Sequence, residues 1–233
     1  MDNLQNQNSP LQGFEALESF ISSFLLCDDH QLTILTLWVA NTWCFSRFHT
    51  IPYLDIRSPE SQCGKSLCLK LLELLACEPA LVTAADPSTL LHRLLDKRSL
   101  SEFRKNIAEI KKNIENSNYP RFPMTFLIDD CHHSFGPSER QPIVALLNCG
   151  ADANARYSHG REEYFVVGPK AFAGNAGLPA SLASRCIPIV LHRRKMDGAS
   201  LKGYRLQDFQ EAWERYAGPV AISRDHENSI ATS

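Results

Sequence analysis

Residues 59–66 combine a glycine, a lysine and a hydroxyl at the spacing of a phosphate-binding loop. In such a loop, backbone amides surround an anion, a lysine reaches the terminal phosphates and a Ser or Thr hydroxyl binds Mg²⁺. The usual pattern is G-x-x-x-x-G-K-[ST], and this chain departs from it at the first glycine, where Pro59 stands. We predict that the run binds the phosphates of ATP, with Lys65 on the phosphates and Ser66 on Mg²⁺. It reads Pro59-Glu60-Ser61-Gln62-Cys63-Gly64-Lys65-Ser66.

A second group of candidate residues ends the apolar run "MTFLIDD" at residues 124–130. A strand that ends in an aspartate typically holds magnesium, and a second acid beside it can orient an attacking water. We therefore assign Asp129 to the metal and Asp130 to the water. The simpler alternatives are a strand end where acids meet solvent, and a strand-to-helix turn in which Gly64 supplies backbone freedom and a serine caps the helix.

The elements around these residues predict an α/β fold. Residues 53–56 read as a strand that enters the loop, and 67–75 as the helix that leaves it. Short apolar strands alternating with helices indicate a mostly parallel sheet covered on both faces. We expect a three-layer domain with about five strands and an N-terminal helix pair. The other predicted strands are 80–84, 124–130, 164–167, 170–173 and 187–191; the other predicted helices are 14–26, 31–45, 87–96, 99–118, 138–148, 179–184 and 206–217.

The domain organisation follows from the same pattern. Residues 1–13 read as a disordered lead, 14–217 as one domain and 218–233 as a flexible tail. Within the domain, 14–45 is the helix pair, 53–192 the nucleotide-binding core and 206–217 a closing helix. Because a strand intervenes between the loop strand and the acid strand, we do not expect these two to be neighbours in the sheet. That arrangement favours an ATPase over a small kinase.

Composition sets limits on the partners. With 24 Lys plus Arg against 26 Asp plus Glu, the chain has no overall field that would attract nucleic acid. Eight cysteines without a C-x-x-C pair favour a reduced, cytoplasmic protein. The longest apolar run, residues 32–45, is too short to cross a bilayer and is interrupted by polar residues, so we expect no membrane association.

Three segments together resemble a known family. They are "LWVANTWCFSRFHTIPYLDIRSPESQCGKS", "FLIDD" and "VGPKAFAGNAGLPASLASRCIPIVLHRR", and the similarity extends over roughly residues 15–215. The chain resembles bacterial and phage P-loop proteins catalogued as a domain of unknown function, which occur alone or beside primase and helicase modules on mobile elements. The resemblance implies a RecA/AAA-like, ring-forming ATPase of DNA replication or processing, with DNA or a primase or helicase as a partner.

The resemblance also implies roles for individual residues. Ser58, Pro59 and Glu60 look like the family's version of the loop entrance, which accounts for the missing glycine. Arg185, in "LASRC", looks like an arginine finger that would act on the site of a neighbouring copy in a homo-oligomer. Asn175 stands where a polar side chain would contact the terminal phosphate or the water.

Two departures keep other functions open. Asp130 replaces the glutamate of the family and is one methylene shorter, and residues 151–153 (Ala-Asp-Ala) replace a basic cluster. Both features favour the alternative of a nucleotide-binding switch or interaction protein with little hydrolysis. A small-molecule kinase would need a basic lid, which the chain after Leu191 does not offer. Trp38, Trp43 and Phe45 allow two interpretations, an adenine pocket beside the loop or core packing, of which packing is the simpler.

Overall fold

The computed structural model describes residues 10–60, 63–83, 86–95, 125–130, 142–175 and 177–192. Its centre is a sheet of five strands in the order β2-β3-β6-β1-β7, and every neighbouring pair is parallel. The prediction of an α/β fold with a parallel sheet of about five strands is therefore confirmed. The strands are β1 (Tyr53–Arg57), β2 (Pro79–Thr83), β3 (Thr125–Asp129), β6 (Lys170–Gly174) and β7 (Cys186–Val190).

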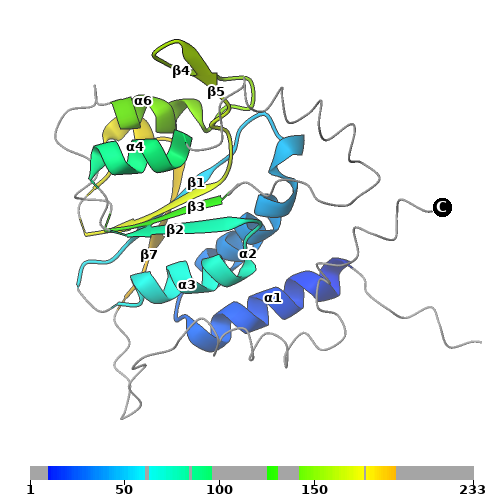
Figure 1. Ribbon diagram of the computed structural model, residues 1–233. Helices are drawn as coiled ribbons and strands as arrows, with labels where there is room; N and C mark the ends of the chain where they lie inside the picture. The colour runs from blue at the N-terminus through cyan, green and yellow to red at the C-terminus, as the bar shows by residue number, and fades with distance from the viewer. Residues whose placement is uncertain are drawn as a thin grey trace, which may run out of the picture.

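One face of the sheet is covered by the N-terminal helices. Helix α1 (Pro10–Phe24), helix α2 (Asp29–Cys44) and helix α3 (Lys65–Leu75) lie together on this side in Figure 1. Their apolar side chains form one buried cluster with Leu54 and Ile56 of β1 and with Ala171 and Ala173 of β6. A short 3₁₀ turn, η1 (Phe45–Arg47), follows α2 and leads toward β1.

The other face is covered by helices from the second half of the fold. Helices α4 (Pro87–Leu95) and α6 (Pro142–Cys149) lie there, opposite α1–α3 in Figure 1, and the short helix α7 (Ala180–Ala183) packs with them. Tyr53, Phe126 and Phe172 supply the strand side of this second core. Because both faces are covered, the central strands are mainly apolar and do not alternate apolar with polar residues. The arrangement is that of a three-layer α/β fold.

A small hairpin differs from the predicted strand at residues 164–167. β4 (Tyr157–His159) pairs antiparallel with β5 (Glu162–Tyr164), and the pair stands beyond α6 in Figure 1. Only Tyr164 of the predicted strand is in a strand, so that prediction was wrong. The physical reason is the buried Lys170, whose Nζ donates to the carbonyl oxygens of Val166 and Gly168 at 3.0 and 2.9 Å. A side chain thus takes the bonds that a neighbouring strand would have made.

The two outer strands of the sheet are β2 and β7. β7 carries Pro188 at its centre, in register with Asp55 of β1. Proline has no N–H to give to a ladder, so it is tolerated at an edge and not in a central strand. The sequence and the topology therefore agree that β7 lies at the border of the sheet.

The predicted element boundaries mostly hold to within one or two residues, with two exceptions at helix ends. Helix α1 begins at Pro10, inside the stretch that was predicted to be a disordered lead, and ends at Phe24 rather than at residue 26. Helix α6 is described from Pro142, whereas residues 138–141 of the predicted helix lie outside the described residues. The predicted helices at 99–118 and 206–217 also lie outside them.

No helix among the residues described above combines the length and the apolar character that a membrane span requires.

Candidate functional site

The predicted phosphate loop joins the carboxyl end of β1 to the first turn of α3. Gly64 is the residue just before the helix and has φ 89°, a conformation that favours glycine over residues with a Cβ. Among the described residues, a Cβ at this position would meet only Leu25 Cδ1, at 3.7 Å, so backbone conformation rather than space selects the glycine. Lys65 is the first residue of α3 and is half-buried. The N-terminus of α3 is thus also the position of the lysine that carries the ammonium group.

Two hydrogen bonds organise the entrance of the loop. Lys65 Nζ donates to Ser58 Oγ at 2.5 Å, and Ser58 Oγ donates to the carbonyl oxygen of Glu60 at 2.5 Å. Pro59 and Glu60 are exposed, whereas Cys63, at the other end of the loop, is buried. The predicted loop residues Ser61 and Gln62 lie outside the described residues.

The structure brings the predicted metal residues together from two elements. Ser66 Oγ, on the first turn of α3, donates to Asp129 Oδ2 at 3.0 Å, and Asp129 is the last residue of β3. β6 lies between β1 and β3 in the sheet, so the expectation that the loop strand and the acid strand are not neighbours is confirmed. The strand that separates them in space is β6, however, and not β2, which separates them in the sequence.

These oxygens suit one kind of cation site. Among the described residues, no three His, Cys, Asp or Glu side chains are grouped closely enough to hold a metal ion by themselves. Mg²⁺ at phosphate sites commonly takes one or two oxygens from the protein and the rest from phosphate and water. The Ser66 hydroxyl and the Asp129 carboxylate fit that donor set.

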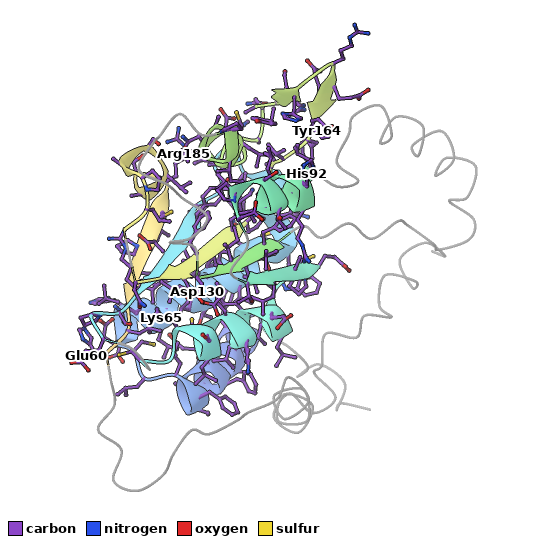
Figure 2. All side chains as sticks on the ribbon, turned by 60° about the vertical axis from the view of Figure 1, so that its left-hand side comes forward. Glu60, Lys65, His92, Asp130, Tyr164 and Arg185 are labelled. Atoms are coloured by element: carbon purple, nitrogen blue, oxygen red, sulfur yellow. The ribbon has the colours of Figure 1, made fainter. Side chains whose placement is uncertain are left out.

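Asp130 follows β3 in a left-handed conformation with φ 53°. Its backbone N–H donates to Asp129 Oδ1 at 3.0 Å, so the aspartate that meets Ser66 through one oxygen is oriented through the other. Non-glycine residues rarely adopt this φ, and such residues concentrate at functional sites. Figure 2 shows Asp130 near Lys65 at the same end of the strands.

Asn175 also lies at this end of the sheet. It directly follows Gly174, which is in register with Arg57, the residue before Ser58. Its side chain is exposed, and it has no hydrogen bond to the part of the loop that the structure describes, residues 58–60 and 63–66. The structure thus places Asn175 on the correct edge without assigning it a partner.

Arg185 lies at the opposite edge. Its carbonyl oxygen accepts from the N–H of Tyr53, the first residue of β1, while Lys65 follows the end of β1. The guanidinium donates to Ser181 O at 2.6 Å and to Ser184 Oγ at 3.4 Å, and the residue is exposed (Figure 2). Within one chain, Arg185 is therefore separated from the loop by the length of the sheet, and its predicted action on a neighbouring copy stays a prediction.

The adenine-pocket interpretation of Trp38 and Trp43 is not supported by their positions. Trp38 Nε1 donates to Pro52 O, before β1, and Trp43 Nε1 donates to Leu75 O, at the end of α3, both at 3.0 Å. Both rings therefore lie toward the edge opposite the loop. The alternative interpretation, core packing, holds for Trp38, which is 2% exposed. Trp43 is about half exposed and packs at the surface.

The corner between α1 and α2 packs against the loop, because Leu25 at this corner lies next to Gly64. Gln31 Nε2 donates to Val190 O at 3.1 Å, which fastens the start of α2 to the end of β7. Cys27, at this corner, and Cys68, on α3, belong to the same apolar cluster as Leu25. Burial raises the pKa of the Cys68 thiol well above its ordinary value. Burial also raises the pKa of Cys27 to about 11, with further contributions from Asp28 and its neighbour.

One charged pair near the loop was missed from the sequence. The guanidinium of Arg57 forms an ion pair with the carboxylate of Asp55, whose side chain is only 5% exposed. Both are in β1, immediately before Ser58. The available signal was two charges in an otherwise apolar strand, "YLDIR".

Neither a scan against models of protein families nor a search of curated proteins gave a match for this chain.

Proposed function

We propose that the chain binds ATP together with Mg²⁺ and hydrolyses it. The observation that carries the proposal is the hydrogen bond between Ser66 and Asp129, formed beside Lys65 at the N-terminus of α3. A hydroxyl next to a lysine at a helix start, facing an acid at the end of a nearby parallel strand, is the arrangement that a nucleotide–magnesium complex requires. An ordinary strand-to-helix turn does not need the acid.

The roles of the residues follow from their chemistry. Lys65 and the amides of the first turn bind the β- and γ-phosphates, and Ser66 Oγ with Asp129 Oδ2 holds the magnesium ion. The ion supplies neutralisation of the charge that develops on the transferred phosphoryl group. Asp130 accepts a hydrogen bond from the attacking water and thereby orients it. Asn175 contacts the terminal phosphate from the end of β6.

In this proposal the site is completed by a second copy of the chain. Arg185 lies at the edge opposite the loop, so a head-to-tail contact would bring it to the phosphates of the next subunit. The family resemblance supports the same role and also supplies the link to DNA replication or to a primase or helicase partner. The described residues themselves add no argument for DNA.

Magnesium-dependent phosphate release from ATP tests the proposal, with and without single-stranded DNA. Lys65→Ala removes the ammonium from the site, and Lys70→Ala is the matched control because it removes a lysine from the same helix five residues further on. We expect turnover in the wild type and in Lys70→Ala and none in Lys65→Ala. Equal activity of the two variants would refute the proposed site, and an increase with DNA would support the replication link.

A mixing experiment tests the contribution of a second copy. Lys65→Ala and Arg185→Ala proteins should each be inactive alone. In a one-to-one mixture, about a quarter of head-to-tail interfaces combine an intact loop with an intact arginine, so activity should return to that fraction. If Arg185→Ala is fully active alone, the arginine has no role in hydrolysis.

The alternative is a switch that binds ATP and scarcely hydrolyses it, and the short side chain of Asp130 favours it. In that case ATP binds to the wild type but not to Lys65→Ala, and no phosphate is released. Asp130→Glu then discriminates further, because the longer acid should raise turnover if a badly placed water is the cause.

A further inference from the structure

Ser58 forms an unusual junction at the entrance of the loop. Its hydroxyl gives its proton to Glu60 O and accepts an N–H from Lys65 Nζ, both at 2.5 Å. The residue is 8% exposed, so neither bond is an incidental contact at the surface. One small side chain thus closes the turn at residues 58–60 and also fixes the end of the lysine.

The neighbouring proline restricts the backbone that carries this hydroxyl. Pro59 has a restricted φ and limits the preceding residue to extended conformations, so the backbone of Ser58 has little freedom to move. Proline also has no N–H, and therefore this loop has one amide fewer to offer an anion than a loop with glycine at that place. The Ser58 hydroxyl belongs to the residue directly before the one that lacks this donor.

We propose that Ser58 is a positioning residue that holds the Lys65 ammonium ready for the terminal phosphates. This inference rests on the proposed function. The ammonium has three N–H donors, and Ser58 occupies one of them, which leaves two for phosphate oxygens. The bond can therefore persist when a nucleotide is bound. Because the flexible lysine chain is already ordered, less conformational entropy is lost on binding.

The role predicts a selective effect on ligands. Ser58→Ala removes both bonds, and ATP should bind about tenfold more weakly, the range expected for one hydrogen bond to a charged group. AMP, which has no β- or γ-phosphate, should bind equally well to the variant and to the wild type. Ser58→Thr keeps the hydroxyl and suits an extended residue before proline, so it should restore ATP affinity. Ser158→Ala, in the distant hairpin, is the matched control.

Thermal unfolding without nucleotide tests whether the serine acts through the lysine. Wild type, Ser58→Ala, Lys65→Ala and the double variant form a cycle. If the two side chains act as a unit, Ser58→Ala lowers the unfolding midpoint less in the Lys65→Ala background than in the wild type. If the shifts in the midpoint of the two single variants add up in the double variant, the hydroxyl only closes its own turn and the inference is overturned. This comparison needs no nucleotide binding, so it also applies to a variant that is less stable than the wild type.

The outcomes separate this inference from the proposed function. If the wild type binds neither ATP nor inorganic tripolyphosphate, both are refuted. If ATP binds in a Lys65-dependent way and Ser58→Ala keeps wild-type affinity, only the positioning role is refuted. Weaker ATP binding with unchanged AMP binding, together with rescue by threonine, supports it.

Discussion

Replacing Gly150 with alanine should destabilise the protein strongly, although the backbone at Gly150 does not have the positive φ that would itself require glycine. Gly150 follows α6 and packs against a buried polar group of three atoms. A Cβ there would lie 2.7 Å from Lys170 Nζ, 2.7 Å from Val166 O and 2.8 Å from Tyr53 Oη. All three distances are shorter than carbon contacts allow, so atoms must move.

None of the three atoms can move without breaking a bond. Lys170 Nζ donates to Val166 O, and Tyr53 Oη donates to Leu147 O at 2.8 Å. Lys170 and Tyr53 are both fully buried. Overpacking costs about 1–3 kcal/mol, and a buried polar group that loses its partner costs about 1–3 kcal/mol. We therefore expect a loss of about 2–6 kcal/mol, or about 4–24 °C in Tm at the 2–4 °C per kcal/mol that is usual for a chain of this size.

Differential scanning calorimetry measures this effect, with Gly177→Ala as the matched control. A Cβ on Gly177 meets no atom of the described part of the chain within 4 Å, so the same chemical change should leave Tm almost unchanged there. Nucleotide affinity of Gly150→Ala, measured well below its Tm, should equal that of the wild type because the loop lies at the other edge of the sheet. If both variants have the wild-type Tm, the buried group around Lys170 is looser than the geometry indicates.

Three further predictions concern other parts of the fold. Hydrogen bonds from the Thr89 hydroxyl and the Thr89 amide lower the pKa of Asp86, so its stabilising effect is present above 3.8, the ordinary value, and is lost as the pH falls through the lowered pKa. Asp86→Ala should therefore reduce Tm more at pH 7 than at pH 2, and an equal loss at both would contradict this. Gly13→Ala should stabilise α1 by about 0.5–1 kcal/mol in thermal unfolding, because nothing lies within 4 Å of the new Cβ, and a decrease in Tm would show an unseen contact. Since the pKa of Cys27 is raised from 9.0 to about 11, iodoacetamide should alkylate it about a hundredfold more slowly at pH 8 than an ordinary thiol, as mass spectrometry of the labelled peptides can show.

The sequence predicted the local elements well because their signals are local. The loop between a strand and a helix, the strand ending in Asp129 and the helix that begins at Pro87 all follow from neighbouring residues, and the structure has them. The order of the strands could not be read in this way. β6 enters the sheet between β1 and β3 from more than forty residues beyond β3, and only tertiary packing determines that insertion.

Gly150 and the hairpin show two further limits. Gly150 reads as a helix stop, for which a left-handed glycine is usual. In the structure, Gly150 is not among the residues with positive φ. A glycine is needed there because a Cβ would collide with Lys170, Val166 and Tyr53, which are distant in sequence. The β4–β5 hairpin did have a local signal, a glycine at Gly160 with φ 64° between two short polar strands, but its strands are too short and too charged to stand out.

Within the candidate site, residue types were predictable and contacts were not. Lys65, Ser66 and Asp129 carry a recognisable spacing, and the structure brings the serine and the aspartate together. The bond from Lys65 to Ser58 depends on how the loop folds back over seven residues, and no spacing rule gives it. The position of Arg185 could have been derived, because a residue that begins a parallel strand lies at the edge opposite a residue that ends one.

The proline at the centre of β7 affects how copies of the chain can meet. Without it, "CIPIV" would be a short apolar strand with a free edge, the kind of segment that recruits further strands into aggregates. Pro188 interrupts that template, since an added strand would lack a ladder bond at its middle. Arg185 stands just before the same strand. A surface with this composition leaves contact through side chains open and resists growth of the sheet by backbone pairing into fibrils.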